Sequence, residues 1–285
     1  MAELTYEIVD VFTDQAFAGN PLAVVLGADS LSGSQLQTLA REFNLSETVF
    51  PLRPTVAGAD YRVRIFTPAA ELPFAGHPCV GCAVTLARLG LLEHGTRVQE
   101  CGAGLIPMEV LGNQATLSGG PVSVGPELSP SPLLSVVGLM ESDFVGPAPR
   151  TTSAGIPHTF LSVSPSSVSR AVLDLAASRE HDVPRVTVFS WNAEARRSHA
   201  RMFDPGHGVL EDPATGSSAL AFGVYLVASG LVPPSGETPY GIDQGAEMGR
   251  PSLLCCTVEA ENGLATRTTV TGQVVPIARG TIRIP

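Results

Sequence analysis

The sequence contains one pattern twice, and this duplication limits the folds that the chain can adopt. The stretch of residues 63–92 resembles the stretch of residues 200–232 along its whole length. Identical pairs include Arg64 and Arg201, Phe66 and Phe203, Pro68 and Pro205 and, after a three-residue insertion, Glu71 and Glu211, Pro73 and Pro213, Gly76 and Gly216, Gly90 and Gly230, and Leu91 and Leu231. A repeat of this kind predicts two structural units of the same design.

Two shorter blocks upstream extend the repeat. Ala-Gly-Asn-Pro from Ala18 corresponds to Ala-Gly-Ile-Pro from Ala154, and Thr-Val-Phe from Thr48 corresponds to Thr-Val-Phe from Thr187. The separations are 136 positions (154 − 18) and 139 positions (187 − 48), close to the 137 from Arg64 to Arg201. Order and spacing are therefore both kept, and 285 residues suffice for two halves of this size.

Each half is predicted to be a sheet around one central helix, an α/β (α+β) architecture. In the first half, apolar runs predict strands over 7–12, 22–26, 48–52 and 61–66, and the spacing over 32–43 predicts a helix. A second helix begins near Gly76-His77-Pro78 and stops at Gly90, with apolar or small residues on every side, so it should be buried. Its counterpart begins near Gly216 and stops at Gly230.

The expected domain boundaries follow from the repeat. The first half covers residues 1–118, and the second covers 150–271. Residues 119–149 are rich in Pro, Ser and Gly and are expected to form a connection. The strand-like end of the chain, about 272–285, is expected to pair back onto one of the halves.

Composition argues against several classes of protein. The formal net charge is −10 and the basic residues are scattered singly, so neither a nucleic-acid footprint nor a polybasic membrane surface is expected. The first residues do not form a secretion signal, and no uninterrupted apolar run is long enough to cross a bilayer. Five cysteines without disulfide spacing fit a reducing compartment, so a cytoplasmic location is expected.

Positions where the two copies differ in reactive residues are candidates for the active site. Glu47 stands opposite Val186, Asp212 opposite Leu72, and His77 opposite Ser217. Each residue also has an ordinary explanation. Glu47 would then be a solvated loop acid or cap, Asp212 an acid favoured before a helix, and His77 a satisfied structural histidine.

The starts of the two buried helices suggest an anion site. Gly76-His77 and Gly216-Ser217 occupy matching amino termini, where backbone N–H groups lack intrahelical acceptors and the helix dipole is positive. If the two halves face one another, these termini form one site, and a substrate carboxylate would fit there.

Six motifs together resemble the signatures of the PhzF-like isomerases of phenazine biosynthesis, in family order over nearly the whole chain. They are Phe17-Ala18-Gly19-Asn20-Pro21, Asn44-Leu45-Ser46-Glu47-Thr48, Arg64-Ile65-Phe66-Thr67-Pro68, Phe74-Ala75-Gly76-His77-Pro78, Glu211-Asp212-Pro213-Ala214-Thr215-Gly216-Ser217 and the stretch from Gln244 to Ser252. The resemblance implies the diaminopimelate-epimerase-like fold, in which two pseudo-symmetric halves enclose the active site in a cleft.

By this resemblance, Glu47 is the acid/base that removes and returns a proton. The other catalytic residues implied, which order the substrate and relay protons, are His77, Asp212 and Ser217. The substrate-binding residues implied are Asn20, Ser46, Gly76, Pro78, Thr215 and Gly216, with the amides at Gly76 and Gly216 holding the carboxylate. Related racemases carry two cysteines where this chain has Ala75 and Thr215, so two-thiol chemistry is not expected.

The sequence therefore predicts an isomerase that shifts a proton on a small carboxylate-bearing metabolite. Neither a cofactor nor a metal is expected, because phosphate loops, a dinucleotide fingerprint and metal-ligand spacing are all missing from the sequence. An epimerase or dehydratase of an amino or hydroxy acid, and a catalytically silent binding protein, are the alternatives. A homodimer is left open, as is a redox role for Cys79 and Cys82.

Overall fold

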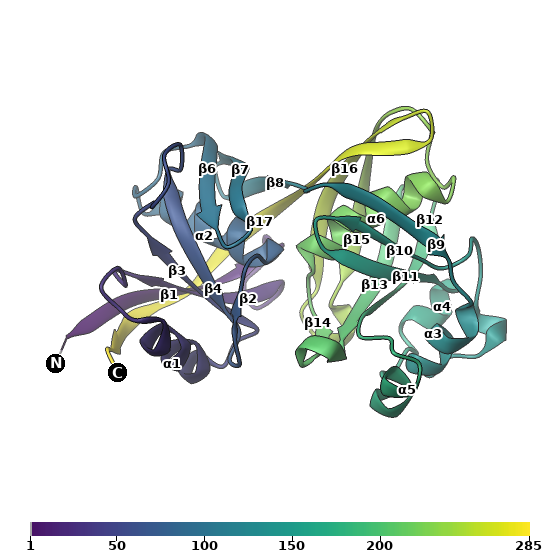
Figure 1. Cartoon of the computed structure of the whole chain (residues 1–285), viewed down its shortest axis with the longest axis horizontal. Helices are drawn as coiled ribbons and strands as arrows, with labels where there is room; N and C mark the ends of the chain where they lie inside the picture. Colours follow the sequence, from purple (N-terminus) through teal and green to yellow (C-terminus); the bar gives the residue numbers. More distant parts are fainter. Residues whose placement is uncertain (1) are drawn as a thin grey trace. The chain divides into compact units, whose positions relative to one another are not determined.

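The computed structural model describes residues 2–285, and these form two compact units joined by two chain crossings (Figure 1). Unit 1 contains the residues up to Ser118 together with Thr271–Pro285, and unit 2 is Gly119–Val270. Each unit has its own central helix, and one long strand near the end of the chain pairs in both units (Figure 1).

Unit 1 is a ring of strands around a helix. Its own strands are β1 (Glu3–Val11), β2 (Asn20–Leu26), β3 (Glu47–Leu52), β4 (Tyr61–Phe66), β5 (Glu71–Leu72), β6 (Gly95–Cys101), β7 (Gly104–Leu111) and β8 (Gln114–Ser118). Pairing runs from β1 through β2, β3, β4, β6, β7 and β8, and the C-terminal part of β17 (Leu264–Arg283) closes the ring between β8 and β1. The pairs β2–β3 and β4–β6 are parallel, whereas β1–β2, β3–β4, β6–β7, β7–β8 and β1–β17 are antiparallel.

The central helix of unit 1 is α2 (Gly76–Arg88), and every residue from Gly76 to Ala87 is buried. It ends before Gly90, the predicted stop, whose φ of +70° is the left-handed conformation that favours glycine after a helix. The outer helix α1 (Gly33–Phe43) has Ser32 as its N-cap and buries Leu36 against the strands. No helix within residues 2–285 is long and apolar enough to cross a membrane.

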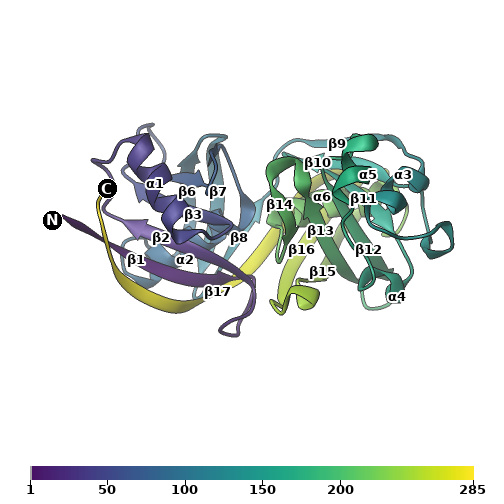
Figure 2. The same cartoon turned by 90° about the horizontal axis from the view of Figure 1, so that it is seen from below.

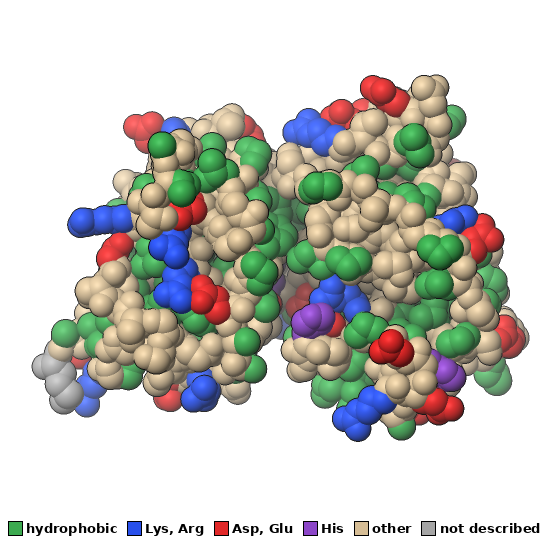
Figure 3. Space-filling model, in the orientation of Figure 1, with side chains coloured by type: hydrophobic (Ala, Val, Ile, Leu, Met, Phe, Trp, Pro, Cys, Tyr) green, Lys and Arg blue, Asp and Glu red, His purple; other side chains and the backbone are tan. Residues whose placement is uncertain are grey.

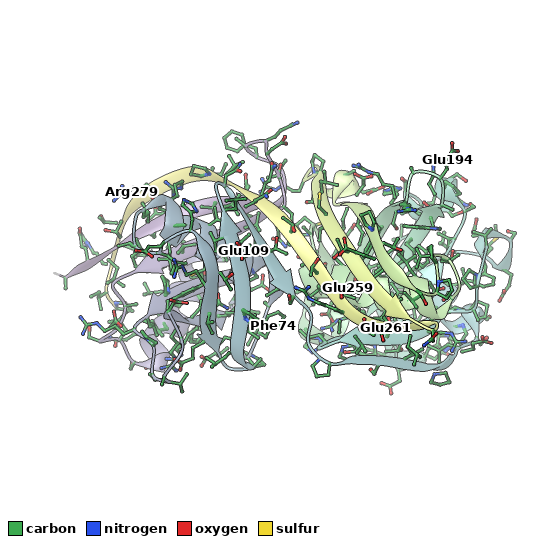
Figure 4. All side chains as sticks on the ribbon, turned by 90° about the horizontal axis from the view of Figure 1, so that it is seen from above. Phe74, Glu109, Glu194, Glu259, Glu261 and Arg279 are labelled. Carbon is green, nitrogen blue, oxygen red and sulfur yellow. The ribbon has the colours of Figure 1, made fainter. Side chains whose placement is uncertain are left out.

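The C-terminal part of β17 is anchored to unit 1 by backbone and charge. It runs antiparallel to β1, with Arg279 opposite Glu7. Glu7 is 3% exposed, and it is paired with Arg88 of α2 and lies 4.0 Å from Arg279, which is labelled in Figure 4. A carboxylate this deeply buried is tolerated because it is paired.

Unit 2 repeats the same design. Its strands are β9 (Val122–Glu127), β10 (Arg150–Ala154), β11 (Pro157–Ser162), β12 (Val186–Asn192), β13 (Arg197–Asp204), β14 (Val209–Asp212), β15 (Gly236–Gln244), β16 (Ser252–Glu261) and the first part of β17. The parallel pairs are β11–β12 and β13–β15, which correspond to β2–β3 and β4–β6 in unit 1. The central helix α6 (Gly216–Ala228) contacts β9, β10, β11 and β16 (Figure 2).

Aromatic rings fill the core around α6. Phe222 lies within 6.1 Å, between ring centroids, of Phe160, Phe189, Tyr225 and Trp191. Phe222 is 2% exposed. Unit 2 therefore holds its central helix with aromatic contacts that are worth more than their area alone.

The expectation that residues 119–149 are only a connection is wrong. This stretch belongs to unit 2 and supplies β9 and α3 (Pro130–Val136), whose Leu133, Leu134 and Val136 are buried. They pack in a second core with α4 (Pro165–Val168) and α5 (Leu175–Glu180). The reason lies in the topology. In unit 2, β9 pairs with β10, just as the end of β17 pairs with β1 in unit 1. Each unit therefore has one strand beside its first hairpin, and in unit 2 residues 119–149 supply it.

The repeated Arg, Phe and Glu residues form the same structural contact in both units. Arg64 binds Glu71 with two hydrogen bonds and lies over the Phe66 ring at 5.1 Å. Arg201 binds Glu211 in the same way, with two hydrogen bonds of 2.8 Å, and lies over the Phe203 ring at 5.1 Å. Basic side chains thus lie beside acidic ones, as on the face of unit 1 in Figure 3. The repeat at these positions reflects folding.

Candidate active site

Glu47 is the first residue of β3, where the loop after α1 enters the sheet of unit 1. Its side chain is only 13% exposed, so Glu47 is not a solvated loop acid. Oε2 of Glu47 lies 3.4 Å from Nε2 of His77, the second residue of α2. The parallel pairing of β2 with β3, with Leu22 opposite Glu47, fixes where the carboxylate enters.

A buried chain of polar groups leads to this carboxylate. Ser46 Oγ donates to Asn20 Oδ1 at 3.1 Å, and Asn20 Nδ2 lies 3.2 Å from Nδ1 of His77. Asn20 is fully buried at the start of β2. The structure thus brings together four predicted residues of unit 1, namely Asn20, Ser46, Glu47 and His77.

The charge and the proton position of His77 follow from this chain. Burial lowers the pKa of His77 from 6.5 to about 3, so the imidazole is neutral near pH 7 and carries a single N–H. Because Nδ1 faces the donor amide of Asn20, Nδ1 is the acceptor and the proton lies on Nε2. The N–H of His77 therefore faces the Glu47 carboxylate.

The depressed pKa of His77 makes the stability of the fold sensitive to acid. Between about pH 6.5 and about pH 3 the unfolded chain binds a proton at this residue and the folded chain does not, so acidification lowers the free energy of unfolding. We expect His77→Gln to lose less of this free energy than the wild type between about pH 7 and about pH 5. Urea unfolding at both pH values measures the difference.

The exposed His94 provides the control for this experiment, since His94→Gln should leave the wild-type acid sensitivity in place. Equal acid sensitivity of His77→Gln and the wild type would contradict the buried neutral imidazole.

The start of α2 presents free amide groups beside His77. Its first backbone bond runs from Cys79 N to Ala75 O, so the N–H groups of Gly76 and His77 have no intrahelical acceptor, and Pro78 has no N–H to offer. Ala75 provides no side-chain cap. These donors lie at the positive end of the helix and suit an anion.

In unit 2, Asp212 ends β14 just before α6 and is 8% exposed. Thr215 Oγ1 donates to Asp212 at 2.5 Å. Gln244 Nε2 donates to the backbone oxygen of Asp212 at 2.7 Å and lies 2.9 Å from Thr215 Oγ1. This network fixes the Asp212 carboxylate beside the start of α6.

Gly245 explains why the motif that begins at Gln244 needs a glycine. Its φ is +82°, and a Cβ there would lie 2.4 Å from Arg250 O and 2.6 Å from Pro213 O. The turn at Gly245 therefore packs directly against the loop that carries Asp212, and it fixes Gln244 in place.

Ser217 is the second residue of α6, after Gly216, and is half-buried. Its Oγ lies 3.0 Å from Nε2 of His158, which is on β11 and 1% exposed. The first helical bond of α6 runs from Ala219 N to Thr215 O, so the amides of Gly216 and Ser217 are free of intrahelical acceptors, as in α2. Unit 2 thus gathers Asp212, Thr215, Gly216 and Ser217 at one helix start.

Sequence reasoning missed two residues of these networks, His158 and Gln244. Gln244 stood within a motif that had no assigned role. His158 follows Pro157 of the repeated Ala-Gly-x-Pro block, but that alignment placed it opposite Leu22, an apolar residue. A histidine within an apolar, strand-like run was the signal in the sequence that could have pointed to His158.

The cysteines of α2 are not placed for thiol chemistry. Cys79 and Cys82 are buried. Burial raises the pKa of Cys79 to about 12 and that of Cys82 well above 9.0, so neither thiol ionises near neutral pH. Cys79 instead accepts a hydrogen bond from Gln99 at 2.9 Å, as a packing residue would.

Other features of the described chain do not point to a different site. Among residues 2–285, no group of three or more His, Cys, Asp or Glu side chains could hold a metal ion. A cavity of 480 Å³ in unit 2 is lined by Leu133, Pro157, Val183 and Arg185, among others, and by none of the predicted site residues. The polar networks at the two helix starts, one in each unit, remain the candidate functional residues.

Comparison with known proteins gives one consistent result. The family model described as "Phenazine biosynthesis-like protein" (PhzC-PhzF) matches residues 9–280. A trans-2,3-dihydro-3-hydroxyanthranilate isomerase of Pseudomonas chlororaphis is 35% identical over 287 residues, covering 97% of this chain and 98% of that protein. The enzyme of the same name from Pseudomonas aeruginosa is 33% identical over 280 residues, covering 96% and 98%.

Solved structures extend the comparison to the fold. A PhzF-family protein of Bacillus anthracis superposes with a TM-score of 0.90 over 100% of both chains, at 23% identity. A hydroxyproline epimerase of Agrobacterium vitis superposes with a TM-score of 0.68 at 13% identity, covering 98% of this chain and 92% of that chain. The two halves around central helices are therefore the epimerase-like fold that the sequence motifs implied.

Proposed function

We propose that this chain, which belongs to the phenazine biosynthesis-like protein family and is an isomerase, shifts a proton on a small carboxylate-bearing metabolite with Glu47 as the acid/base. The observation that carries the proposal is the polar chain from Ser46 through Asn20 and His77 to Glu47. Every group in it except the carboxylate is neutral and held in place, so Glu47 is the group that can take up a proton.

The proposed step needs one base. Glu47 takes a proton from a C–H bond, the electron pair of that bond moves into the adjacent double-bond system, and Glu47 returns a proton to a different carbon after its own proton has exchanged with solvent. His77 Nε2–H faces the carboxylate, with Nε2 3.4 Å from Glu47 Oε2. A base within hydrogen-bond reach of the reacting C–H typically contributes ~100-fold or more to the rate.

A proton shift by Glu47 fits these residues better than epimerisation by two thiols. Two-thiol epimerisation removes a proton with one thiolate and returns a proton from a second thiol on the opposite face of the same carbon. The helix starts offer Ala75 and Thr215 at the positions where the related racemases have thiols, and Cys79 and Cys82 are buried with raised pKa values.

The substrate carboxylate is assigned to the helix starts. Each helix start by itself offers donors in positively polarised surroundings: the amide of Gly76 in unit 1, and the amide of Gly216 and the hydroxyl of Ser217 in unit 2. Such surroundings also stabilise negative charge that develops in the reaction. Asp212 is proposed to order the polar part of the substrate and to relay protons, because its carboxylate is fixed by Thr215.

The names of the Pseudomonas relatives suggest the ligands to test. Those enzymes are isomerases of trans-2,3-dihydro-3-hydroxyanthranilate, so we propose a ring carboxylate of this kind as the substrate class. Anthranilate and its neutral amide, anthranilamide, then form a matched pair that differs in the charge of one group.

Thermal unfolding with each ligand tests the proposal, since a ligand that binds only the folded chain raises the apparent stability. We expect anthranilate to raise the midpoint of unfolding and anthranilamide to leave it almost unchanged. Equal shifts for both would contradict a carboxylate site. The same assay with trans-2,3-dihydro-3-hydroxyanthranilate, followed by turnover, tests the substrate itself.

A further inference from the structure

The two units place a buried polar side chain at the same point of the fold. Asn20 on β2 contacts His77, and His158 on β11 contacts Ser217, which are the second residues of the two central helices. Both side chains are buried, with exposed fractions of 0% for Asn20 and 1% for His158. Each is therefore held rigidly against the residue that begins its helix.

The strand pairing supports this correspondence. Asn20 lies opposite Val11 in the β1–β2 pair, and His158 lies opposite Thr152 in the β10–β11 pair. Val11 packs by the α2 residue Gly81, and Thr152 donates to the backbone oxygen of Ala221, which occupies the same place in α6. His158 is thus the counterpart of Asn20, and the question is what it does to Ser217.

The protonation of His158 follows from its surroundings. Burial, and then the charges of Arg185 and His207, keep the pKa of His158 well below 6.5, so the ring is neutral and has one N–H. Its Nδ1 is buried and has no hydrogen-bond partner among residues 2–285. A buried N–H without an acceptor is rarer in proteins than an acceptor without a donor, so the proton belongs on Nε2.

We propose that His158 is a positioning residue that donates its Nε2–H to Ser217 Oγ and thereby leaves the Ser217 hydroxyl proton for the substrate carboxylate. This rests on the function proposed above. A hydroxyl has one proton to donate. If Ser217 donated its proton to His158, only lone pairs of Ser217 Oγ would face the anion, and they would repel it. Because His158 Nε2–H is the donor instead, the Ser217 hydroxyl can donate its proton to the carboxylate at the start of α6.

The proton position can be measured without any substrate. In ¹⁵N-histidine-labelled protein, two-bond ¹H–¹⁵N correlation spectra distinguish the two neutral tautomers, and the spectrum of His158→Gln assigns the signal. We expect the Nε2–H tautomer in the wild type near pH 7. A proton on Nδ1, or a charged ring, would overturn the proposal whether or not the ligand site is correctly identified.

Binding of anthranilate tests the consequence for Ser217. His158→Leu should weaken binding about tenfold, the scale of one hydrogen bond to a charged group, and Ser217→Ala should do the same. His158→Gln keeps an amide donor and should restore binding to within about threefold of the wild type. Because the two residues act through one hydrogen bond, the double variant His158→Leu/Ser217→Ala should be about as weak as either single variant.

Losses that multiply in the double variant would overturn the proposal, as would a failure of His158→Gln to restore binding in a protein whose thermal unfolding is unchanged. If anthranilate does not bind the wild type, the substrate class proposed above fails, while the tautomer measurement still decides the role of His158.

Discussion

Glu47→Gln is expected to lower isomerase turnover by about 100-fold or more, the usual scale for a positioned general base. Glutamine keeps the size of the side chain and its ability to hydrogen-bond, but its amide cannot take up a proton from carbon. Affinity for the carboxylate ligand should change little, because the anion is assigned to the helix starts. Steady-state kinetics and ligand titration on the same preparation measure both.

Glu42→Gln is the matched control, because it makes the same chemical change away from the site. Glu42 is exposed on the outer helix α1. It should leave turnover unaltered. A Glu47→Gln variant that is folded and turns over at the wild-type rate would remove Glu47 from the mechanism.

Phe222→Ala should cost about 3–5 kcal/mol of unfolding free energy, among the largest effects of any single substitution in this chain. The ring lies between Phe160, Phe189 and Tyr225 at the centre of unit 2, and its removal leaves a cavity that these packed rings cannot fill. Denaturant unfolding measures the loss.

Phe17→Ala is the control for this stability experiment, since it deletes the same atoms from a side chain that is 72% exposed. We expect a change within about 0.5 kcal/mol. A Phe222→Ala variant as stable as Phe17→Ala would mean that the aromatic cluster does not hold α6.

The sequence predicted several individual helices and strands well, because apolar patterning and helix-end residues act locally. The helix expected over 32–43 is α1 with Ser32 as its cap, and the helix expected from Gly76 ends just before Gly90. The strand expected over 61–66 has those bounds. These predictions depend on neighbours in the chain, which a sequence displays directly.

Residues 119–149 were misjudged because their structure depends on distant partners. β9 is short and contains Pro and Gly, and it becomes a strand through pairing with β10. Leu133 and Leu134 begin a mostly apolar run over residues 133–139 that a count of Pro, Ser and Gly overlooks, and α5 and β12 cover its buried side chains. A composition rule for connections cannot detect pairing of this kind.

The sequence singled out candidate site residues one by one but did not show which of them contact one another. Differences between the two copies singled out Glu47 and His77, and the structure places them 3.4 Å apart. The role of Asn20 as the amide that fixes the His77 proton, and the contact between His158 and Ser217, needed coordinates. The sequence alignment of the repeated blocks differs from the structural correspondence by one or two residues. For this reason it does not place His158 opposite Asn20.

Proton exchange with solvent tests the central claim most directly. Wild type and Glu47→Gln are incubated with substrate in heavy water at matched protein concentration, and deuterium in the recovered substrate and product is measured by mass spectrometry. If Glu47 removes and returns the proton, the wild type introduces deuterium at carbon and Glu47→Gln introduces about 100-fold less or none. Equal incorporation by the two proteins would contradict the account and leave Asp212 as the next candidate base.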